Sequence, residues 1–208
     1  MHDPTGDLRR QPARSRIRRV LARFDTVDRA AYLAVAASRT PMLDAGLARL
    51  SNAANNSGLW LATAAGLAVL GGRRQRHAAA LGVTAIVVTS ATVNLLIKPV
   101  LRRARPNRHD AAVPELRHVR MPASHSFPSG HAASAFAFAT TVGHQLPAAA
   151  LPLRILATAV AYSRIHTGVH YPGDVLVGAG IGAMCGTAVR STVNRRTLAP
   201  SRPRRRGR

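Results

Sequence analysis

Scarce residue types set the first limits on this chain of 208 residues. Cysteine occurs once, as Cys185, so no disulfide can form within the chain. Acidic residues number 8 against 30 basic ones, and Asp174 is the only acidic residue after Glu115. Because no second carboxylate stands beside Asp174, the sequence offers no carboxylate pair to hold Mg²⁺. We therefore expect no metal and no other cofactor.

The formal net charge of +22 indicates an anionic partner, either nucleic acid or an anionic membrane surface. The basic residues gather at both ends of the chain, in a turn at residues 73–76 and around residues 98–108, whereas long segments between them carry almost no charge. This distribution argues against nucleic acid and favours contact with membrane lipids. No feature of the sequence indicates an oligomeric state.

Apolar runs in the middle of the chain predict membrane-spanning helices, which need about 20 residues each. The last run is rich in glycine and alanine, and small residues let helices pack closely inside a membrane. A soluble bundle with buried helices of the same composition is the alternative. The five predicted spans are residues 53–70, 78–97, 129–146, 148–162 and 174–193.

The chain divides into four predicted segments. Residues 1–23 are rich in arginine and interrupted by proline, which predicts disorder or a loose helix on the membrane surface. Residues 24–56 predict two amphipathic, interfacial helices separated at Pro41. Residues 57–193 form the membrane domain, and residues 194–208 form a basic, disordered tail. The predicted fold class is all-α: an integral-membrane bundle of five or six transmembrane helices with N-terminal amphipathic helices.

Counting turns between five spans places the loops 99–128 and 165–173 on one face of the membrane. The turns at 73–76 and 143–154 and the basic tail fall on the other face. The positive-inside rule makes that second face cytoplasmic, which predicts a multi-pass plasma-membrane protein with the first face outside. Five spans leave the arginine-rich N-terminus outside as well, against the rule. A sixth span within residues 24–56 would remove this conflict.

Three short motifs lie in or beside the two loops of the extracytoplasmic face. The first fits K-x6-R-P and begins at Lys98, the only lysine among 30 basic residues. The second is Pro-Ser-Gly-His at residues 128–131, and the third fits S-R-x5-H-x3-D over residues 163–174. Each motif is weak alone. All three together, in this order and with this spacing, are specific for one chemistry.

The second motif opens a predicted membrane helix, and the free N–H groups at a helix N-terminus bind phosphate. Gly130 lets the backbone approach an anion closely. Ser129 supplies a hydroxyl donor, and His131 in the first turn faces the bound group. These residues predict one wall of a phosphate site.

The third motif places His170 four residues before Asp174. A histidine nucleophile needs an unprotonated attacking nitrogen, and a carboxylate on the other ring nitrogen fixes that tautomer. The pair therefore predicts a nucleophile with its orienting carboxylate. The alternative for Asp174 alone is a helix cap.

Cations from separate segments complete the predicted site. Phosphoryl transfer spreads negative charge over three equatorial oxygens, and fixed cations stabilise that charge. We interpret Lys98, Arg105 and Arg164 as the phosphate-binding cations. Three further arginines of the first loop are interpreted as membrane-edge anchors, namely Arg102, Arg103 and Arg108.

The motif set resembles the type 2 phosphatidic acid phosphatase family, which shares its site with vanadium haloperoxidases. The resemblance covers residues 53–193 and includes every motif position. It implies a metal-independent phosphatase in which His170 attacks phosphorus and forms a phosphohistidine. His131 would protonate the leaving alkoxide and then activate water, while Asp174 orients His170.

Two features depart from the family pattern. The family has six spans, whereas this sequence shows five clear ones. Three histidines near the motifs have no motif role, namely His118, His125 and His166. His166 is interpreted as a structural loop histidine, with a place in the lining of the pocket as the alternative, and the sequence assigns no role to His125.

Membrane burial and an outer-face site predict a substrate whose phosphate lies at headgroup depth. Phosphatidic acid, phosphatidylglycerol phosphate and a polyprenyl phosphate or diphosphate all fit, and so does a polyprenyl-linked sugar phosphate of cell-wall synthesis. The preference for alanine and arginine is typical of a GC-rich bacterial genome. A non-enzymatic reading, a basic protein binding membrane surfaces through its tails, leaves the three motifs unexplained. The apolar runs argue against a soluble haloperoxidase.

Overall fold

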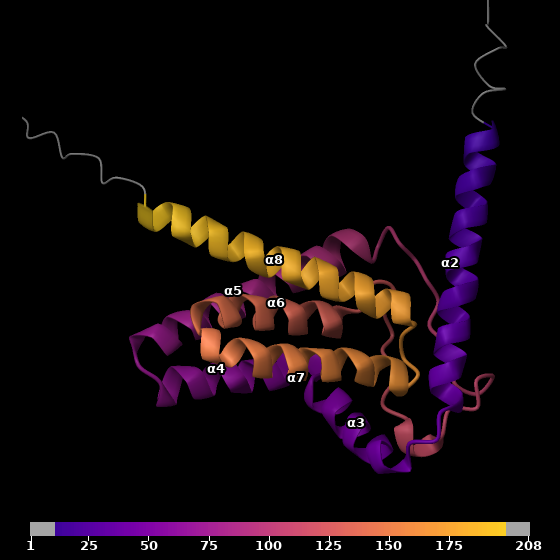
Figure 1. The fold of residues 1–208 in the computed structure, drawn as a ribbon, viewed down its shortest axis with the longest axis horizontal. Helices are drawn as coiled ribbons and strands as arrows, with labels where there is room; N and C mark the ends of the chain where they lie inside the picture. Colours follow the sequence, from indigo (N-terminus) through magenta and orange to yellow (C-terminus); the bar gives the residue numbers. More distant parts are fainter. Residues whose placement is uncertain (1–10, 199–208) are drawn as a thin grey trace, which may run out of the picture.

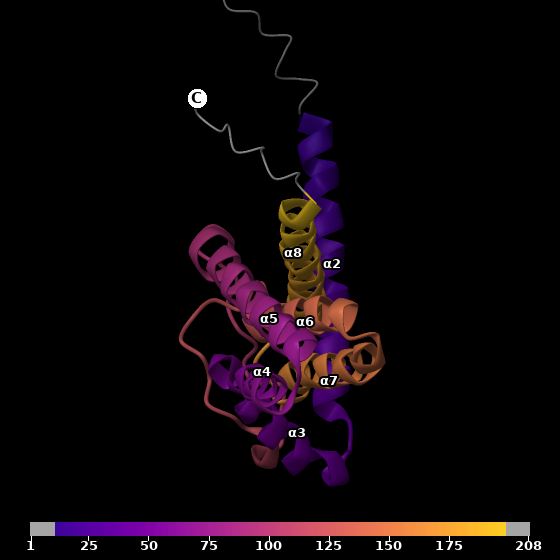
Figure 2. The same ribbon diagram turned by 90° about the vertical axis from the view of Figure 1, so that its left-hand side faces the viewer.

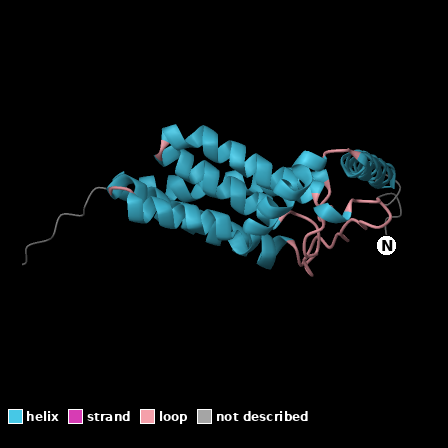
Figure 3. Cartoon of the chain, turned by 90° about the horizontal axis from the view of Figure 1, so that it is seen from below, coloured by secondary structure: helices cyan, strands magenta, loops and turns pink. Residues whose placement is uncertain are grey.

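The computed structural model describes residues 11–198, and the regular elements in this range are all helical (Figures 1 and 3). This confirms the predicted all-α fold. Short 3₁₀ segments lie at Asn55–Ser57 (η1) and Glu115–Arg117 (η3), and a π-helical segment at Thr92–Ile97 (η2) continues α5. The α-helices are α2 (Gln11–Ala37), α3 (Pro41–Ala53), α4 (Gly58–Leu70), α5 (Arg73–Ala91), α6 (Gly130–Gln145), α7 (Pro147–His166) and α8 (Pro172–Leu198).

Helix α6 lies at the centre of the bundle and packs against α5, α7 and α8. Its contact with α8 is close because α8 presents glycines to it. A Cβ added at Gly186 would lie 2.7 Å from the carbonyl oxygen of Ala137. The rings of Trp60 in α4 and Phe138 in α6 are in contact, tilted by 40° with their centroids 5.5 Å apart. The predicted role of small residues in helix packing thus applies to the α6–α8 contact.

Three helices in the described range are long and apolar enough to cross a membrane, namely Arg73–Ile97, Pro147–His166 and Pro172–Val193. Two of the five predicted spans are shorter as helices, because α4 has 13 residues and α6 has 16. The predicted span 53–70 is interrupted by left-handed backbone at Asn56 (φ 51°) and Ser57 (φ 59°), so α4 begins only at Gly58.

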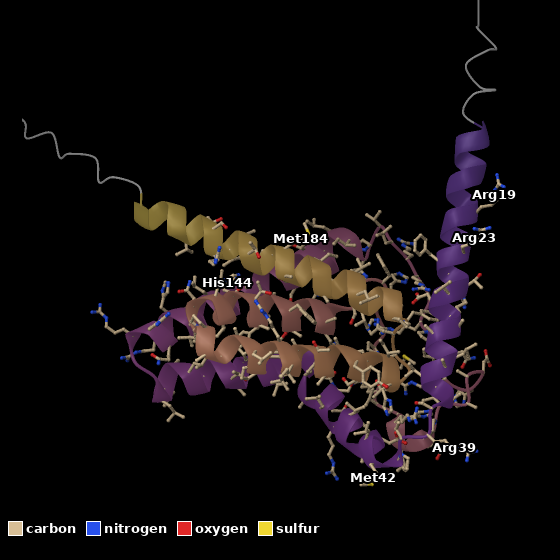
Figure 4. The ribbon with its side chains drawn as sticks, in the orientation of Figure 1. Arg19, Arg23, Arg39, Met42, His144 and Met184 are labelled. Carbon is tan, nitrogen blue, oxygen red and sulfur yellow. The ribbon has the colours of Figure 1, made fainter. Side chains whose placement is uncertain are left out.

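Large apolar side chains point outward from these long helices. Leu95 is 72% exposed, Ile155 62% and Met184 73%, and Figure 4 shows Met184 on the outer side of α8. Exposing these apolar side chains to water would be unfavourable in free energy, whereas contact with lipid chains carries no such penalty. The exterior therefore fits a membrane environment.

The connections between helices divide between the two ends of the bundle. In Figure 1 the long loop 99–128 and the α7–α8 turn lie at the end beside α2, while the α4–α5 and α6–α7 turns lie at the opposite end with the C-terminal end of α8. The loops that carry the three motifs are thus gathered at one end, as the count of turns predicts.

Helix α2 runs across the motif-bearing end of the bundle and contacts α7 and α8 (Figures 1 and 2). Its arginines Arg19 and Arg23 lie on the part that extends past the bundle (Figure 4). The helix begins at Gln11, so residues 11–23 take the helical of the two predicted alternatives, and residues 1–10 of that segment lie outside the described range.

The C-terminal boundary also shifts. Helix α8 continues to Leu198, so the first residues of the predicted tail, 194–198, belong to a helix. The rest of that tail, 199–208, lies outside the described residues.

Candidate active site

A cavity of about 260 Å³ opens at the motif-bearing end of the bundle. It is bordered by α5, by the N-terminal turn of α6, by η1 and by the loops before α6 and α8. Five of the predicted site residues line it: Lys98, Arg105, Gly130, His131 and His170. Motifs that are more than 70 residues apart along the chain therefore meet in one cavity.

The N-terminus of α6 forms one wall of the cavity. Ser129 is the N-cap, and its side-chain oxygen accepts a hydrogen bond of 3.4 Å from the Ala132 N–H. The Ser129 N–H donates to the Asp174 carbonyl at 2.9 Å, which ties this helix start to the start of α8. Gly130 is the first helical residue, and a Cβ there would lie 3.9 Å from Lys98 Nζ. The side chain of Ser129 is buried and does not line the cavity.

The two ring nitrogens of His170 face different partners. Nδ1 lies 3.4 Å from Asp174 Oδ2, and Nε2 lies 3.1 Å from Arg105 Nη1. A carboxylate beside Nδ1 keeps the proton on that nitrogen and leaves a lone pair on Nε2. Asp174 is held in place because its Oδ2 accepts the Tyr171 N–H at 2.9 Å. The unprotonated nitrogen thus faces the cations of the cavity.

Burial and charge set the protonation of the residues in the loops. Burial lowers the pKa of His170 to about 4; Asp174 opposes this shift, and the cations Arg105 and Arg164 add to it. The ring is therefore neutral near pH 7. Burial lowers the pKa of Arg105 to about 10, and burial together with the Arg105 charge lowers that of Lys98. A bound phosphate would offset the repulsion between these two cations.

The side chains of Lys98 and Arg105 are held by neutral groups and not by carboxylates. Arg105 donates from Nε to the Ser124 carbonyl and from Nη1 to the Val169 carbonyl, both at 2.8 Å. Lys98 Nζ lies 3.2 Å from Ser124 Oγ. Their positive charges therefore remain available to an anion.

Arg164 lies deeper than the other two cations and does not line the cavity. Its Nη1 donates to the Ser51 carbonyl at 3.3 Å and to the Ser51 hydroxyl. Its Nε and Nη2 are buried without a hydrogen-bond partner among the described residues. Buried donors without partners are costly, so these two groups fit an anion that enters the site.

Arg103 belongs to this site, and the prediction that it is a membrane-edge anchor is wrong. Its Nη1 lies 2.8 Å from Asp174 Oδ1 and 2.6 Å from Asp28 Oδ2, and its Nη2 lies 2.9 Å from Asp25 Oδ1. Its guanidinium also stacks on the Tyr171 ring, 4.1 Å from the centroid. The sequence signal available for this cluster was a pair of acidic residues three positions apart, Asp25 and Asp28, in a chain with few acids, and it did not indicate which arginine they bind.

Two further residues at the site carry no sequence signal. The buried Ser126 hydroxyl donates to Asp174 Oδ2, and it lies 3.5 Å from His170 Nδ1. Asn55 Oδ1 lies 2.9 Å from His131 Nε2, although the two residues are 76 positions apart. Neither contact can be read from spacing, because each depends on how distant segments pack.

The three histidines without a motif role do not line the cavity. His166 is in the last turn of α7, where its Nε2 lies 2.9 Å from Asp44 Oδ1, which also pairs with Arg117. His118 Nε2 lies 3.0 Å from the Val113 carbonyl. His125 contributes its carbonyl to Arg105 at 3.3 Å. His166 is therefore a helix residue in a buried ion-pair cluster, not a loop histidine.

Residues 78–198 match the family model described as the PAP2 superfamily. The chain belongs to this superfamily. The predicted resemblance to the type 2 phosphatidic acid phosphatase family is thereby confirmed, and the phosphatase relatives described next confirm the prediction of a membrane phosphatase for lipid phosphates. A histidine nucleophile is general for the PAP2 superfamily, whose matched region contains all three motifs.

Curated relatives are phosphatases. The chain is 41% identical over 141 residues to the decaprenylphosphoryl-5-phosphoribose phosphatase of Mycobacterium tuberculosis, covering 65% of this chain and 75% of that protein. The Mycolicibacterium smegmatis protein of the same name is 38% identical over 137 residues, covering 64% and 69%. The lipid A 4'-phosphatase of Bacteroides thetaiotaomicron is 32% identical over 98 residues, covering 45% and 44%.

Two solved structures share the fold. Aquifex aeolicus LpxE superposes with a TM-score of 0.63 at 25% identity, covering 78% of this chain and 93% of that one. The PAP2-type phosphatidylglycerolphosphate phosphatase of Bacillus subtilis superposes with a TM-score of 0.65 at 21% identity, covering 85% and 89%. The Bacillus subtilis protein is a transmembrane phosphatase, which agrees with the apolar exterior of this bundle.

Proposed function

We propose that this protein removes the phosphate monoester from a polyprenyl-linked sugar phosphate, with its active site on the extracytoplasmic face of the plasma membrane. The observation that carries the chemistry is the neutral His170, whose Nε2 faces the Arg105 guanidinium at 3.1 Å. The choice among lipid phosphates is supported by the relatives at 38–41% identity, which are named for a phosphoribose attached to decaprenyl phosphate.

In the first step, His170 Nε2 attacks phosphorus as the bond to the leaving oxygen breaks. The P–N bond that forms gives a phosphohistidine, and His131 gives a proton to the leaving alkoxide. Lys98, Arg105 and Arg164 stabilise the charge on the equatorial oxygens. The Gly130 N–H at the start of α6 adds a donor from the helix N-terminus. Ser129 is the N-cap of α6 and so keeps the neighbouring Gly130 N–H in position.

In the second step, water attacks the phosphohistidine on phosphorus. His131, now neutral, takes a proton from the water, the P–N bond breaks and inorganic phosphate leaves. Asp174 keeps the Nδ1 proton of His170 in place through both steps and stabilises the positive charge on the ring. No residue in this sequence of steps needs a metal ion.

Arg103 acts as a positioning residue through Asp174. It fixes Oδ1 of that carboxylate, which leaves Oδ2 for the His170 side. Arg103 is itself fixed by Asp25 and Asp28, so α2 contributes to the geometry of the nucleophile.

We expect Arg103→Gln to lower kcat about 10- to 100-fold while KM changes much less, because the substrate contacts stay in place and only the carboxylate loses its orientation. Phosphate release by the purified protein in detergent measures both constants. The matched control is Arg102→Gln, because Arg102 is exposed and its only side-chain hydrogen bond within residues 11–198 goes to the Pro99 carbonyl, at 3.3 Å. Arg103→Lys should recover part of the rate. Equal effects of Arg103→Gln and Arg102→Gln would refute the positioning role.

Phosphate release from a panel of lipids in EDTA tests the proposed function. We expect the purified protein to hydrolyse decaprenylphosphoryl-5-phosphoribose faster than phosphatidic acid, phosphatidylglycerol phosphate or a polyprenyl diphosphate, and at the same rate with and without EDTA. Preference for another lipid would replace the proposed substrate but keep the phosphatase. Loss of release in EDTA, restored by a divalent ion, would contradict the metal-independent mechanism.

A further inference from the structure

The catalytic cavity has a second group of lining residues that phosphate chemistry does not require. They come from η1, from the last turns of α5 with η2, and from α6, and they carry hydroxyl or amide groups without charge. They are Asn56, Ser57, Ser90, Asn94 and Ser134. The cations bind phosphate, so this neutral polar wall, as we call these five residues, must face another part of the substrate.

The backbone at η1 is strained at two residues of the neutral polar wall, and both line the cavity that contains His131 and His170. Asn56 (φ 51°) and Ser57 (φ 59°) are consecutive non-glycine residues in the left-handed region. Such residues are strained and gather at functional sites. The preceding Asn55 contacts His131 Nε2 at 2.9 Å. The strained turn therefore lies directly beside the residue that protonates the leaving group.

Asn94 reaches the cavity from a second irregular segment. It lies in the π-helical stretch Thr92–Ile97, one turn before Lys98. Its neighbours Leu95 and Leu96 are 72% and 66% exposed, as expected for residues facing lipid. Single π-turns inside helices occur often at functional sites because they redirect one side chain. Asn94 is thus a polar residue that lines the cavity although its neighbours along the chain, Val93 and Leu95, are apolar.

The amides of this wall are open to a ligand. In residues 11–198 the side chains of Asn56 and Asn94 make no hydrogen bond to protein, whereas Ser90 and Ser134 lie only 3.5 Å apart, at the limit of a weak contact. An amide offers two donors and an acceptor, and a hydroxyl offers both roles. A partner with several hydroxyls matches this inventory, because each sugar hydroxyl also donates and accepts.

We propose that the neutral polar wall is the binding subsite for the sugar of the substrate, with Asn94 and Asn56 as its specificity-determining residues. This inference rests on the proposed function and assigns the leaving group to particular residues. A diacylglycerol leaving group would leave both amides of the wall without a partner on the substrate, and sites built to hydrogen-bond hydroxyls reject analogues that lack them. The cavity of about 260 Å³ fits a headgroup and leaves the long lipid chain in the bilayer.

The test compares two substrates on the same protein. Decaprenylphosphoryl-5-phosphoribose and dioleoyl phosphatidic acid are presented in one detergent, and the ratio of their kcat/KM values is measured. We expect Asn94→Leu and Asn56→Gly each to lower this ratio at least tenfold, since each removes hydrogen bonds to the sugar. Glycine at 56 tolerates the left-handed backbone, so this variant removes the amide without adding strain.

The control is Thr92→Val. Thr92 belongs to the same π-helical segment, does not line the cavity and donates to the Val88 carbonyl of its own helix at 2.8 Å. Its ratio should equal that of the wild type. A ratio of rates is independent of the fraction of protein that is folded, so poor expression of a variant does not obscure the result.

The outcomes separate the inference from the proposed function. If the wild type releases phosphate from phosphatidic acid but not from the sugar lipid, the proposed function fails. If it cleaves the sugar lipid and the Asn94→Leu and Asn56→Gly ratios equal that of Thr92→Val, the subsite inference is wrong while the proposed function stands.

Discussion

Replacing His170 with alanine is expected to abolish phosphate release, with a loss of about four orders of magnitude or more in kcat. Removing a covalent nucleophile leaves only the binding and electrostatic contributions, which cannot form the intermediate. The side chain is 1% exposed and faces the cavity beside Arg105, so no neighbouring group can take its place. Phosphate release from a lipid phosphate in detergent measures the loss.

His144→Ala is the matched control for this substitution. His144 lies in the last turn of α6 at the opposite end of the bundle (Figure 4). Its replacement should leave turnover unchanged. Rapid quenching in alkali, where phosphohistidine survives, should trap labelled protein in the wild type and in His144→Ala only. Turnover by His170→Ala within tenfold of the wild type would overturn the phosphohistidine mechanism.

Asp174→Asn is expected to lower turnover about 10³- to 10⁴-fold, because it favours the tautomer of His170 that cannot act as a nucleophile. The carboxylate accepts on both oxygens: Oδ2 from the Tyr171 N–H at 2.9 Å and from Ser126, and Oδ1 from Arg103 at 2.8 Å. An asparagine amide has only one acceptor oxygen. With its NH₂ at the Oδ2 position, it faces His170 Nδ1 and drives the proton onto Nε2, which removes the nucleophilic lone pair.

The opposite amide orientation is also unfavourable. It places the NH₂ group against the Arg103 guanidinium, which leaves two donors facing each other in a buried site. We therefore expect Asp174→Asn to lower stability by about 1–3 kcal/mol in addition to turnover. Thermal unfolding in detergent measures the loss of stability, and phosphate release measures the loss of turnover.

Asp110→Asn is the control for this pair of measurements, because Asp110 is an exposed loop residue. It should change neither stability nor turnover. Reduced stability of Asp174→Asn with normal turnover per folded molecule would show that Asp174 serves only to start α8.

Part of the site could be predicted from residue types and spacing alone. A histidine four residues before an aspartate at a helix start can meet it within one turn, and a Pro-Ser-Gly-His sequence before an apolar run starts a helix. These are local relations, which chain geometry fixes within a few residues. Alternation of turns likewise placed the motif loops at one end of the bundle.

Other features needed the tertiary structure. Arg103 could not be distinguished from Arg102 by sequence, since both follow the same apolar helix. Only the packing of α2 across the bundle end brings Asp25 and Asp28 to one of them. The length of α4 also escaped prediction, because a left-handed turn at Asn56 and Ser57 decides where that helix begins.

The sequence by itself determined the fold class, the family and the chemical groups of the site, because helical periodicity, apolar length and motif spacing are properties of neighbouring residues. The tertiary structure decided which of several equivalent arginines fixes Asp174, which asparagine contacts His131 and which neutral residues share the cavity with the cations. Those choices depend on contacts between segments more than 70 residues apart, whose approach is set by close packing of the whole bundle.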